Sequence, residues 1–145
     1  MPIVVEINDD ESNDEAFEEV FSYFRYIDEK FSTYKPTSEI SAINNNAIGV
    51  SEYSDDMKEV LSLSDETKNE TNGYFDIKKL DGALDPSGLV KGWSILKVAH
   101  LLKLRNIKNF YIEAGGDIEV SGLNSEHKPW RIGIENPFKK PNETA

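Results

Sequence analysis

The sequence predicts an α+β fold, in which an antiparallel or mixed sheet is flanked by helices. Three long segments have apolar residues spaced three and four apart, the pattern of helices that bury one face. Short apolar runs between turn residues have the composition of strands. Because 145 residues suit one domain, we assign residues 1–138 to it and residues 139–145 to a polar tail.

The first half of the chain is predicted to form a strand followed by helices. A strand at 3–7 opens the domain, and a helix at 12–31 follows with Ser12 as its N-cap. The apolar residues that share a face of this helix are Phe17, Val20, Phe21, Phe24, Ile27 and Phe31. A short helix is then expected at 38–43, and a short strand at 48–50.

The second half is predicted to contain two long helices and the rest of the sheet. Ser54 caps a helix at 54–70, and an extended segment at 74–77 follows it. A helix at 88–104 is expected to direct these residues inward: Trp93, Leu96, Ala99 and Leu102 or Leu104. The remaining strands are predicted at 109–113, 118–120 and 130–134, with a tight turn at Gly115-Gly116 between the first two.

The balance of charge argues against several classes of partner. With 27 acidic and 16 basic residues the net charge is −11, so neither nucleic acid nor an anionic membrane is expected to bind. Cysteine is absent, which excludes a disulfide framework and a thiolate nucleophile. The chain shows no transmembrane run and no signal-peptide pattern, which as written predicts a cytoplasmic location.

The segment Asp85-Pro86-Ser87-Gly88-Leu89-Val90-Lys91-Gly92-Trp93 is a candidate anion site, because it runs from a turn into the start of a helix. Ser87 and Lys91 add a hydroxyl and a positive charge, and Asp85 is suited to a cation or a ligand amide. The plainer alternative is an ordinary capped helix, with Asp85 as the cap. That alternative is favoured when the segment is taken by itself.

Three further segments have the composition of a site for a planar ring. Tyr74 and Phe75 follow a polar turn, and Asp76 beside them can accept a hydrogen bond from a ring or a ribose. Tyr34 lies in an irregular segment between two helices, where its ring is available for stacking. The turn Ala114-Gly115-Gly116-Asp117 lets a flat ring approach the backbone. Each has a structural alternative, namely core aromatics, a helix–loop staple and a hairpin turn.

The order of these segments is more specific than any one of them. Over residues 3–138 the chain resembles the ApbE family of FAD:protein FMN transferases. The segments that carry the resemblance are Phe31-Ser32-Thr33-Tyr34 with Ser38-Glu39-Ile40-Ser41 and Asn44, Thr71-Asn72-Gly73-Tyr74-Phe75-Asp76, Asp85-Pro86-Ser87-Gly88-Leu89-Val90-Lys91-Gly92, Ala114-Gly115-Gly116-Asp117-Ile118, and Trp130-Arg131-Ile132-Gly133-Ile134-Glu135-Asn136-Pro137.

The resemblance implies an α+β fold that binds FAD in a cleft beside a divalent metal, usually Mg²⁺. The family moves the FMN part of FAD to a threonine hydroxyl of a target protein and releases AMP. The implied targets are flavin-carrying subunits of ion-pumping NADH:quinone reductase and related redox complexes. The residues carried over as the FAD site are Tyr34, Tyr74, Phe75, Asp76, Asp85 and Lys91, and Gly88 would offer its carbonyl to the metal.

Two departures from the family pattern limit what the resemblance implies. The stretch between Asp76 and Asp85 is shorter than in many members. The family continues with a histidine-bearing segment and an Asp–Thr metal motif that do not occur here, so the catalytic residues are expected in a missing C-terminal segment. The chain alone is therefore expected to be a poor catalyst.

Two alternatives to FMN transfer stay open. They are a metal-dependent FAD pyrophosphatase and a non-catalytic flavin-binding module. The resemblance also qualifies the expected location, because many family members are exported lipoproteins.

Overall fold

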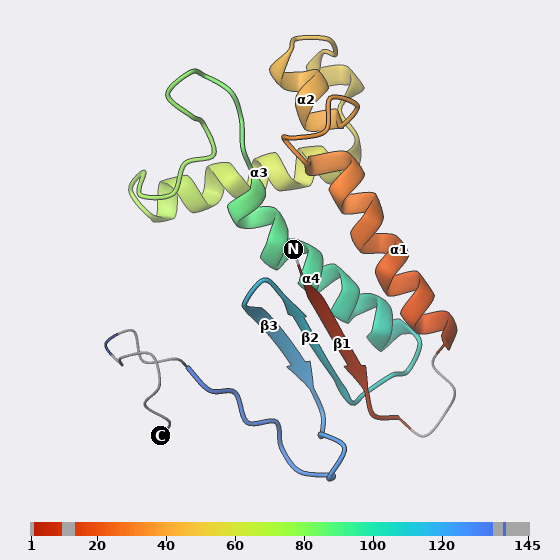
Figure 1. The fold of residues 1–145 in the computed structure, drawn as a ribbon. Helices are drawn as coiled ribbons and strands as arrows, with labels where there is room; N and C mark the ends of the chain where they lie inside the picture. The colour runs from red at the N-terminus through yellow and green to blue at the C-terminus, as the bar shows by residue number, and fades with distance from the viewer. Residues whose placement is uncertain (1, 10–13, 135–137, 139–145) are drawn as a thin grey trace.

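The computed structural model describes residues 2–9, 14–134 and 138 (Figure 1). Its elements in chain order are β1 (Ile3–Ile7), α1 (Asp14–Phe31), α2 (Glu39–Asn44), a 3-10 turn (Val50–Glu52), α3 (Asp55–Glu70), α4 (Ser87–Leu104), β2 (Phe110–Ala114) and β3 (Asp117–Ser121). The α+β prediction is confirmed. None of the described helices is both long enough and apolar enough to cross a bilayer.

The sheet has the order β1-β2-β3, and both pairs of strands are antiparallel. β1 pairs with β2 from Ile3 opposite Ala114 to Ile7 opposite Phe110. β2 turns directly into β3 through Gly115 and Gly116, whose φ angles of 55° and 92° suit the turn that matches the twist of a hairpin. The first and last strands in chain order thus flank the middle strand.

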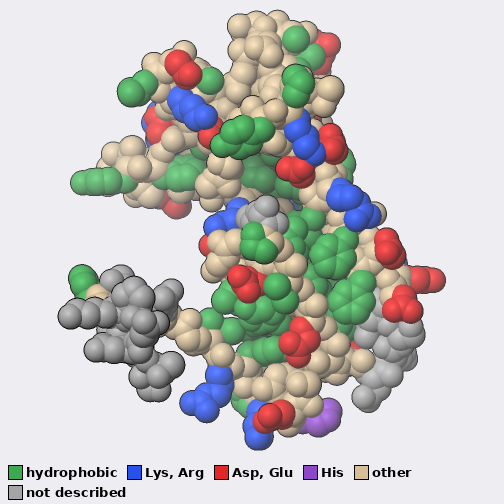
Figure 2. All heavy atoms as spheres, viewed as in Figure 1, with side chains coloured by type: hydrophobic (Ala, Val, Ile, Leu, Met, Phe, Trp, Pro, Cys, Tyr) green, Lys and Arg blue, Asp and Glu red, His purple; other side chains and the backbone are tan. Residues whose placement is uncertain are grey.

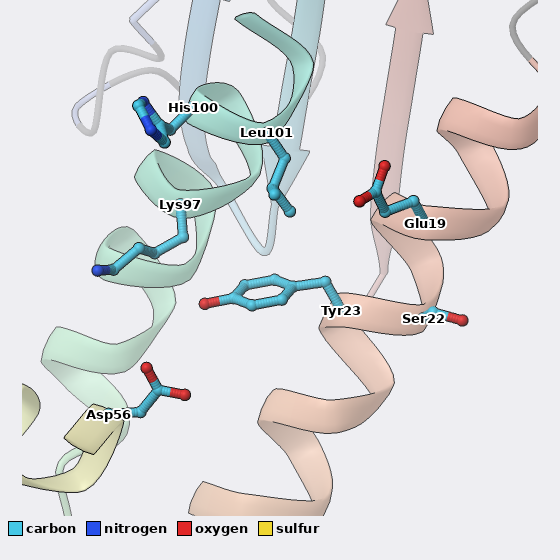
Figure 3. A pocket seen from close by; sticks show the side chains of 7 residues that line it. All are labelled: Glu19, Ser22, Tyr23, Asp56, Lys97, His100 and Leu101. Atoms are coloured by element: carbon cyan, nitrogen blue, oxygen red, sulfur yellow. The ribbon is translucent and has the colours of Figure 1, made fainter. Parts of the chain in front are cut away.

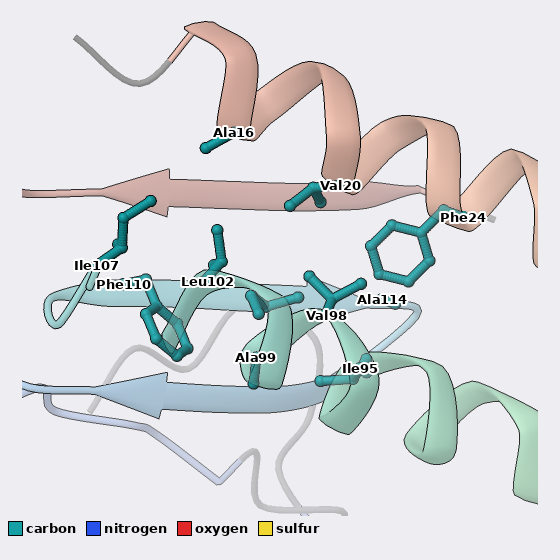
Figure 4. Packing of buried hydrophobic residues seen from close by; sticks show 11 residues of the cluster. Ala16, Val20, Phe24, Ile95, Val98, Ala99, Leu102, Ile107, Phe110 and Ala114 are labelled. Carbon is teal, nitrogen blue, oxygen red and sulfur yellow. The ribbon is translucent and has the colours of Figure 1, made fainter. Parts of the chain in front are cut away.

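One face of the sheet packs against α1 and α4 (Figure 4). Alternate residues of β2 are fully buried on this face, as expected for a strand with one covered side. We call the cluster the sheet core, and its buried members are Ala16, Val20, Phe24, Ile95, Val98, Ala99, Leu102, Ile107, Phe110, Ile112 and Ala114.

A second cluster, the helix core, joins the other half of α4 to the remaining helices. Its buried members are Ile27, Phe31, Ile40, Ile43, Met57, Val60, Val90 and Trp93. The rings of Phe31 and Trp93 meet edge to face with their centroids 5.7 Å apart. Because α4 supplies side chains to both clusters, its first turn is anchored in the helix core and its last turns in the sheet core.

The other face of the sheet is only partly covered by the described residues. Tyr111 and Glu113 alternate with the buried residues of β2, and Val4 of β1 is 49% exposed opposite Glu113. Figure 2 shows hydrophobic side chains gathered over this part of the molecule, with acidic ones among them. Trp130 packs against this face, since its ring lies 5.6 Å from that of Tyr111 and its Nε1 donates to the Ser121 carbonyl at 2.9 Å.

Two predicted strands, at 48–50 and 130–134, are wrong, and the segment at 74–77, which is expected to be extended, is not part of a strand. Residues 48–50 lead into a 3-10 turn, in which the Glu52 carboxylate accepts from the Gly49 amide at 2.8 Å. Residues 74–77 lead into a hairpin whose one bridge joins Lys78 to Leu84. Residues 130–134 follow an isolated bridge between Leu123 and Pro129 and lie outside the sheet.

Several expectations about single residues are also settled. Ser54 caps α3 as predicted, since its side chain accepts from the Met57 amide at 3.2 Å. Of the alternatives Leu102 and Leu104, Leu102 is the buried one, whereas Leu96, expected to face inward, is 60% exposed, and Phe21 is exposed as well. The predicted cap Ser12, the tail at 139–145 and the Asn136-Pro137 end of the last motif lie outside the described residues.

Two leucines of α4 test this assignment of faces. Leu102→Ala should lower the free energy of unfolding by about 2–5 kcal/mol, because it leaves a cavity in the sheet core. The same change at Leu96 should cost no more than about 0.5 kcal/mol, since that side chain is 60% exposed. Urea unfolding of both variants measures the difference, and equal losses would contradict the orientation of α4.

Candidate functional site

The candidate site is built around the start of α4. The first amides of a helix have no partner within it, so they form a positive end that attracts anions. Pro86 is the N-cap and is buried, and the Asp85 carboxylate before it accepts from the Ser87 amide at 3.3 Å. Asp85 therefore engages the helix start through one carboxylate oxygen, Oδ1.

Lys79 is the second charged group of the site. Its Nζ lies 2.9 Å from Oδ2 of Asp85, with the lysine side chain 49% exposed and the aspartate 24% exposed. This contact lowers the pKa of the Asp85 carboxyl below its ordinary value and raises the pKa of Lys79. The pair is partly screened by solvent, so it holds the two side chains together weakly.

A short hairpin places both residues. The Asp85 amide donates to the Ile77 carbonyl and the Lys79 amide to the Ala83 carbonyl, each at 2.8 Å. Asn44, at the end of α2, clamps the returning arm, because its Nδ2 donates to the Leu84 carbonyl at 2.9 Å and its Oδ1 accepts from the Leu84 amide at 2.8 Å. Residues 40 positions apart are thereby joined beside the start of α4.

Tyr34 lies in the loop between α1 and α2, and its ring is 95% exposed. The buried Ser38 holds this loop, since its hydroxyl donates to the Ser32 carbonyl at 2.7 Å. The loop thus presents the ring of Tyr34 to solvent.

The three residues of the aromatic motif after α3 lie in different surroundings. Phe75 is half-buried, and a methyl group built on Gly88 would lie 3.5 Å from its ring, so Phe75 packs over the first turn of α4. Tyr74 is 97% exposed. Asp76 faces the end of α3 instead, where its carboxylate lies 2.6 Å from Nζ of Lys68, and this contact lowers its pKa.

Lys91, one turn further along α4, faces the sheet. Its Nζ donates to the Gly115 carbonyl at 3.2 Å and lies 3.2 Å from Oδ2 of Asp117. The contact connects the helix motif to the glycine turn between β2 and β3. Lys91 thus lies on the sheet side of α4, whereas Lys79 lies at its start.

The described residues do not make up a magnesium site by themselves. Within residues 2–9, 14–134 and 138, no three or more carboxylates and histidines come together as a metal site would require. Gly88 lies in the first turn of α4, and one carbonyl oxygen leaves the octahedral shell of Mg²⁺ unfilled. The role of Gly88 as a metal ligand stays a prediction.

A separate cavity of about 440 Å³ lies between α1 and α4, away from the predicted residues (Figure 3). Its lining is Glu19, Ser22, Tyr23, Asp56, Lys97, His100 and Leu101. Tyr23 extends from α1 toward α4, and burial raises the pKa of its hydroxyl. The carboxylates outnumber the single lysine here, which makes this cavity a poor site for an anionic dinucleotide.

Sequence reasoning missed Lys79 and the role of Asn44. A lysine in a polar turn has no periodic pattern, and its contact with Asp85 exists only because the hairpin folds back on itself. Asn44 carried part of a motif, yet nothing in its neighbourhood indicates a partner 40 residues away. The signal that could have found both is the shortened stretch between Asp76 and Asp85.

Comparisons with known proteins concern the family and the fold of the chain. The sequence model described as the ApbE family matches residues 1–80 and 77–145. The FAD:protein FMN transferase of Vibrio cholerae serotype O1 is 44% identical over 54 residues, which are 37% of this chain and 16% of that protein. The enzyme of the same name from Haemophilus influenzae is 43% identical over 54 residues, with the same shares.

Two solved structures share the fold. The flavin transferase ApbE from Vibrio cholerae superimposes with a TM-score of 0.83 at 21% identity, covering 93% of this chain and 60% of that one. The apo flavinyl transferase ApbE of Pseudomonas stutzeri gives a TM-score of 0.79 at 16% identity, covering 91% and 61%. This chain therefore spans less than two thirds of the length of either structure.

The Asn44 clamp can be tested by substitution. Asn44→Ala removes two hydrogen bonds to Leu84 and should lower the free energy of unfolding by about 1–3 kcal/mol. The Leu84 amide should also exchange with solvent faster, as hydrogen-exchange mass spectrometry would measure. Asn45→Ala is the matched control because Asn45 is exposed, and equal exchange in both variants would contradict the clamp.

The ion pair can be tested by titration. Lys79→Met should raise the pKa of Asp85 toward its ordinary value, measured by carboxyl ¹³C NMR, while that of Asp76, paired with Lys68, should stay unchanged. Because the folded pKa of Asp85 is depressed, the pair stabilises the fold above about pH 4. That stabilisation disappears as the pH falls through the folded-state pKa. An unmoved Asp85 pKa in the variant would show that Lys79 is not its partner.

Proposed function

This chain belongs to the ApbE family, and on that premise we propose that it binds FAD at the start of α4 and serves FMN transfer to a threonine hydroxyl of a target protein. The observation that carries the proposal is that Asn44, Phe75 and Asp85 are brought together around the start of α4 and the residues just before it. These residues come from three separate motifs of the sequence. The relatives are named FAD:protein FMN transferases, and the proposed activity is taken from that name.

The residues present suit different parts of FAD. The exposed ring of Tyr34 offers a face to a flat heterocycle, which stacks favourably on aromatic side chains. The positive end of the α4 dipole is suited to the pyrophosphate. Asp85, already an acceptor for the Ser87 amide, can accept from a ribose hydroxyl or a ring N–H of the nucleotide.

The proposed reaction breaks the phosphoanhydride bond of the FAD pyrophosphate and forms a phosphate ester with threonine. The threonine oxygen attacks the phosphorus on the FMN side of the pyrophosphate, and the bond to the AMP phosphate breaks. AMP leaves with the electron pair of that bond, and the hydroxyl proton is transferred to a base. In such phosphoryl transfers the protein acts mainly by positioning and by neutralising charge. The residues at the start of α4 are proposed to hold the nucleotide for this step.

The partners proposed for this site follow from the same activity. FAD is the small-molecule substrate, and the polypeptide substrate is the flavin-carrying subunit of a redox complex. Mg²⁺ is the metal proposed to act with FAD, through ligands that include residues beyond those described. Because the chain spans 60–61% of the solved relatives above, we propose that it binds FAD but turns it over slowly on its own.

FAD binding is the test of this proposal. Titration of the chain with FAD, followed by flavin fluorescence with and without Mg²⁺, should give saturable binding. Tyr34→Leu should weaken that binding about tenfold, since ring stacking of this kind is worth about 1 kcal/mol or more. Tyr26→Leu is the matched control, because Tyr26 is 41% exposed on α1 and hydrogen-bonded to Asp56.

The products separate the remaining alternatives. Incubation with FAD, Mg²⁺ and a threonine-containing flavoprotein subunit should give FMN attached to the protein together with AMP. Free FMN with AMP would identify a pyrophosphatase, and saturable binding without product would identify a flavin-binding module. The proposed site would be refuted if the chain failed to bind FAD, or if Tyr34→Leu and Tyr26→Leu had the same effect.

A further inference from the structure

We propose that Lys79 is a further ligand-binding residue of this site and that its ammonium binds a phosphate group of the dinucleotide. The inference rests on the proposed function and adds a residue that no family motif of this sequence contains. It starts from position. The Nζ of Lys79 lies 2.9 Å from the carboxylate of Asp85, the charged residue at the start of α4.

The backbone of Lys79 is fixed while its side chain remains accessible. Its amide donates to the Ala83 carbonyl at 2.8 Å, and its carbonyl accepts from the Gly82 amide at 3.0 Å. The side chain is 49% exposed and reaches across to Asp85. The ammonium of Lys79 is therefore held in position and is accessible to an anion from solvent.

The charge of the chain favours a cation at this position. The chain carries a net charge of −11, and the pyrophosphate of FAD is itself anionic. Two nearby lysines are engaged elsewhere, since Lys68 pairs with Asp76 and Lys91 with Asp117. Lys79 is paired with a residue of the site itself, so its charge already lies where the ligand is proposed to bind.

The existing ion pair does not prevent phosphate binding. An ammonium group has three N–H donors, so Lys79 can bind a phosphate oxygen while it still touches Asp85. If the contact with Asp85 is released, the carboxylate keeps the Ser87 amide as a donor. A half-exposed pair is weak enough for the exchange. Without Lys79, the negative charge of Asp85 would face the ligand uncompensated.

The test compares three ligands on three proteins. Wild type, Lys79→Met and Lys78→Met are titrated with FAD, ADP and riboflavin by calorimetry in the presence of Mg²⁺. Lys79→Met should weaken the binding of FAD and of ADP about tenfold, which is the effect of losing one charge-assisted hydrogen bond. The affinity for riboflavin should stay unchanged. Lys78→Met is the matched control because it removes the same charge from the neighbouring position of the hairpin, and it should change each affinity less than twofold.

The other outcomes refute the proposal in distinguishable ways. Equal weakening of FAD and riboflavin would show that Lys79 only positions Asp85. No difference between the two lysine variants would show that the hairpin contributes only general charge. If the wild-type protein bound neither FAD nor ADP, both the proposed function and the role of Lys79 would be refuted. In an Asp85→Asn background, Lys79→Met should still weaken ADP, because a phosphate contact does not depend on the carboxylate.

Discussion

The burial of α4 on several sides at once is the constraint on which the rest of the structure depends. Its residues fill both the sheet core and the helix core, so the helix cannot turn about its axis without opening one of them. Val98 and Leu102 are almost completely buried against the sheet, and Trp93 is buried against α1. Close packing of this kind allows little adjustment. The start of α4 is thereby held in place, and with it the position of the candidate site.

The candidate site itself is made of weaker contacts on that rigid support. The ion pairs of Lys79 and Asp76 are exposed, and two aromatic rings, Tyr34 and Tyr74, face solvent almost entirely. The Asn44 clamp is the part-buried exception, and it ties the hairpin to α2. A fixed helix end surrounded by loosely held side chains can close on a ligand without disturbing the core, which is common where proteins bind ligands.

Local rules predicted the elements well, and contacts between distant residues explain where they failed. The cap at Ser54 follows from its immediate neighbours, so the sequence was sufficient for it. Helix α4 is apolar on most sides, so spacing alone could not tell that Leu102 is inside and Leu96 outside. Residues 130–134 have the composition of a strand, but no strand of the described sheet pairs with them. The pairing of Lys79 with Asp85 depends on a hairpin that no short pattern specifies.

The pairing of β1 with β2 has a consequence for the order in which the chain can fold. Ile3 and Ala114 face each other across more than one hundred intervening residues, whereas β2 and β3 are neighbours in the chain. Contacts between residues that are distant in the chain form late, because closing the long loop between them costs conformational entropy before the contacts can stabilise anything. During synthesis β1 is made before β2, so β1 cannot pair until β2 has been synthesised. Its three inward isoleucine and valine side chains must stay unpaired until nearly the whole described chain has been made.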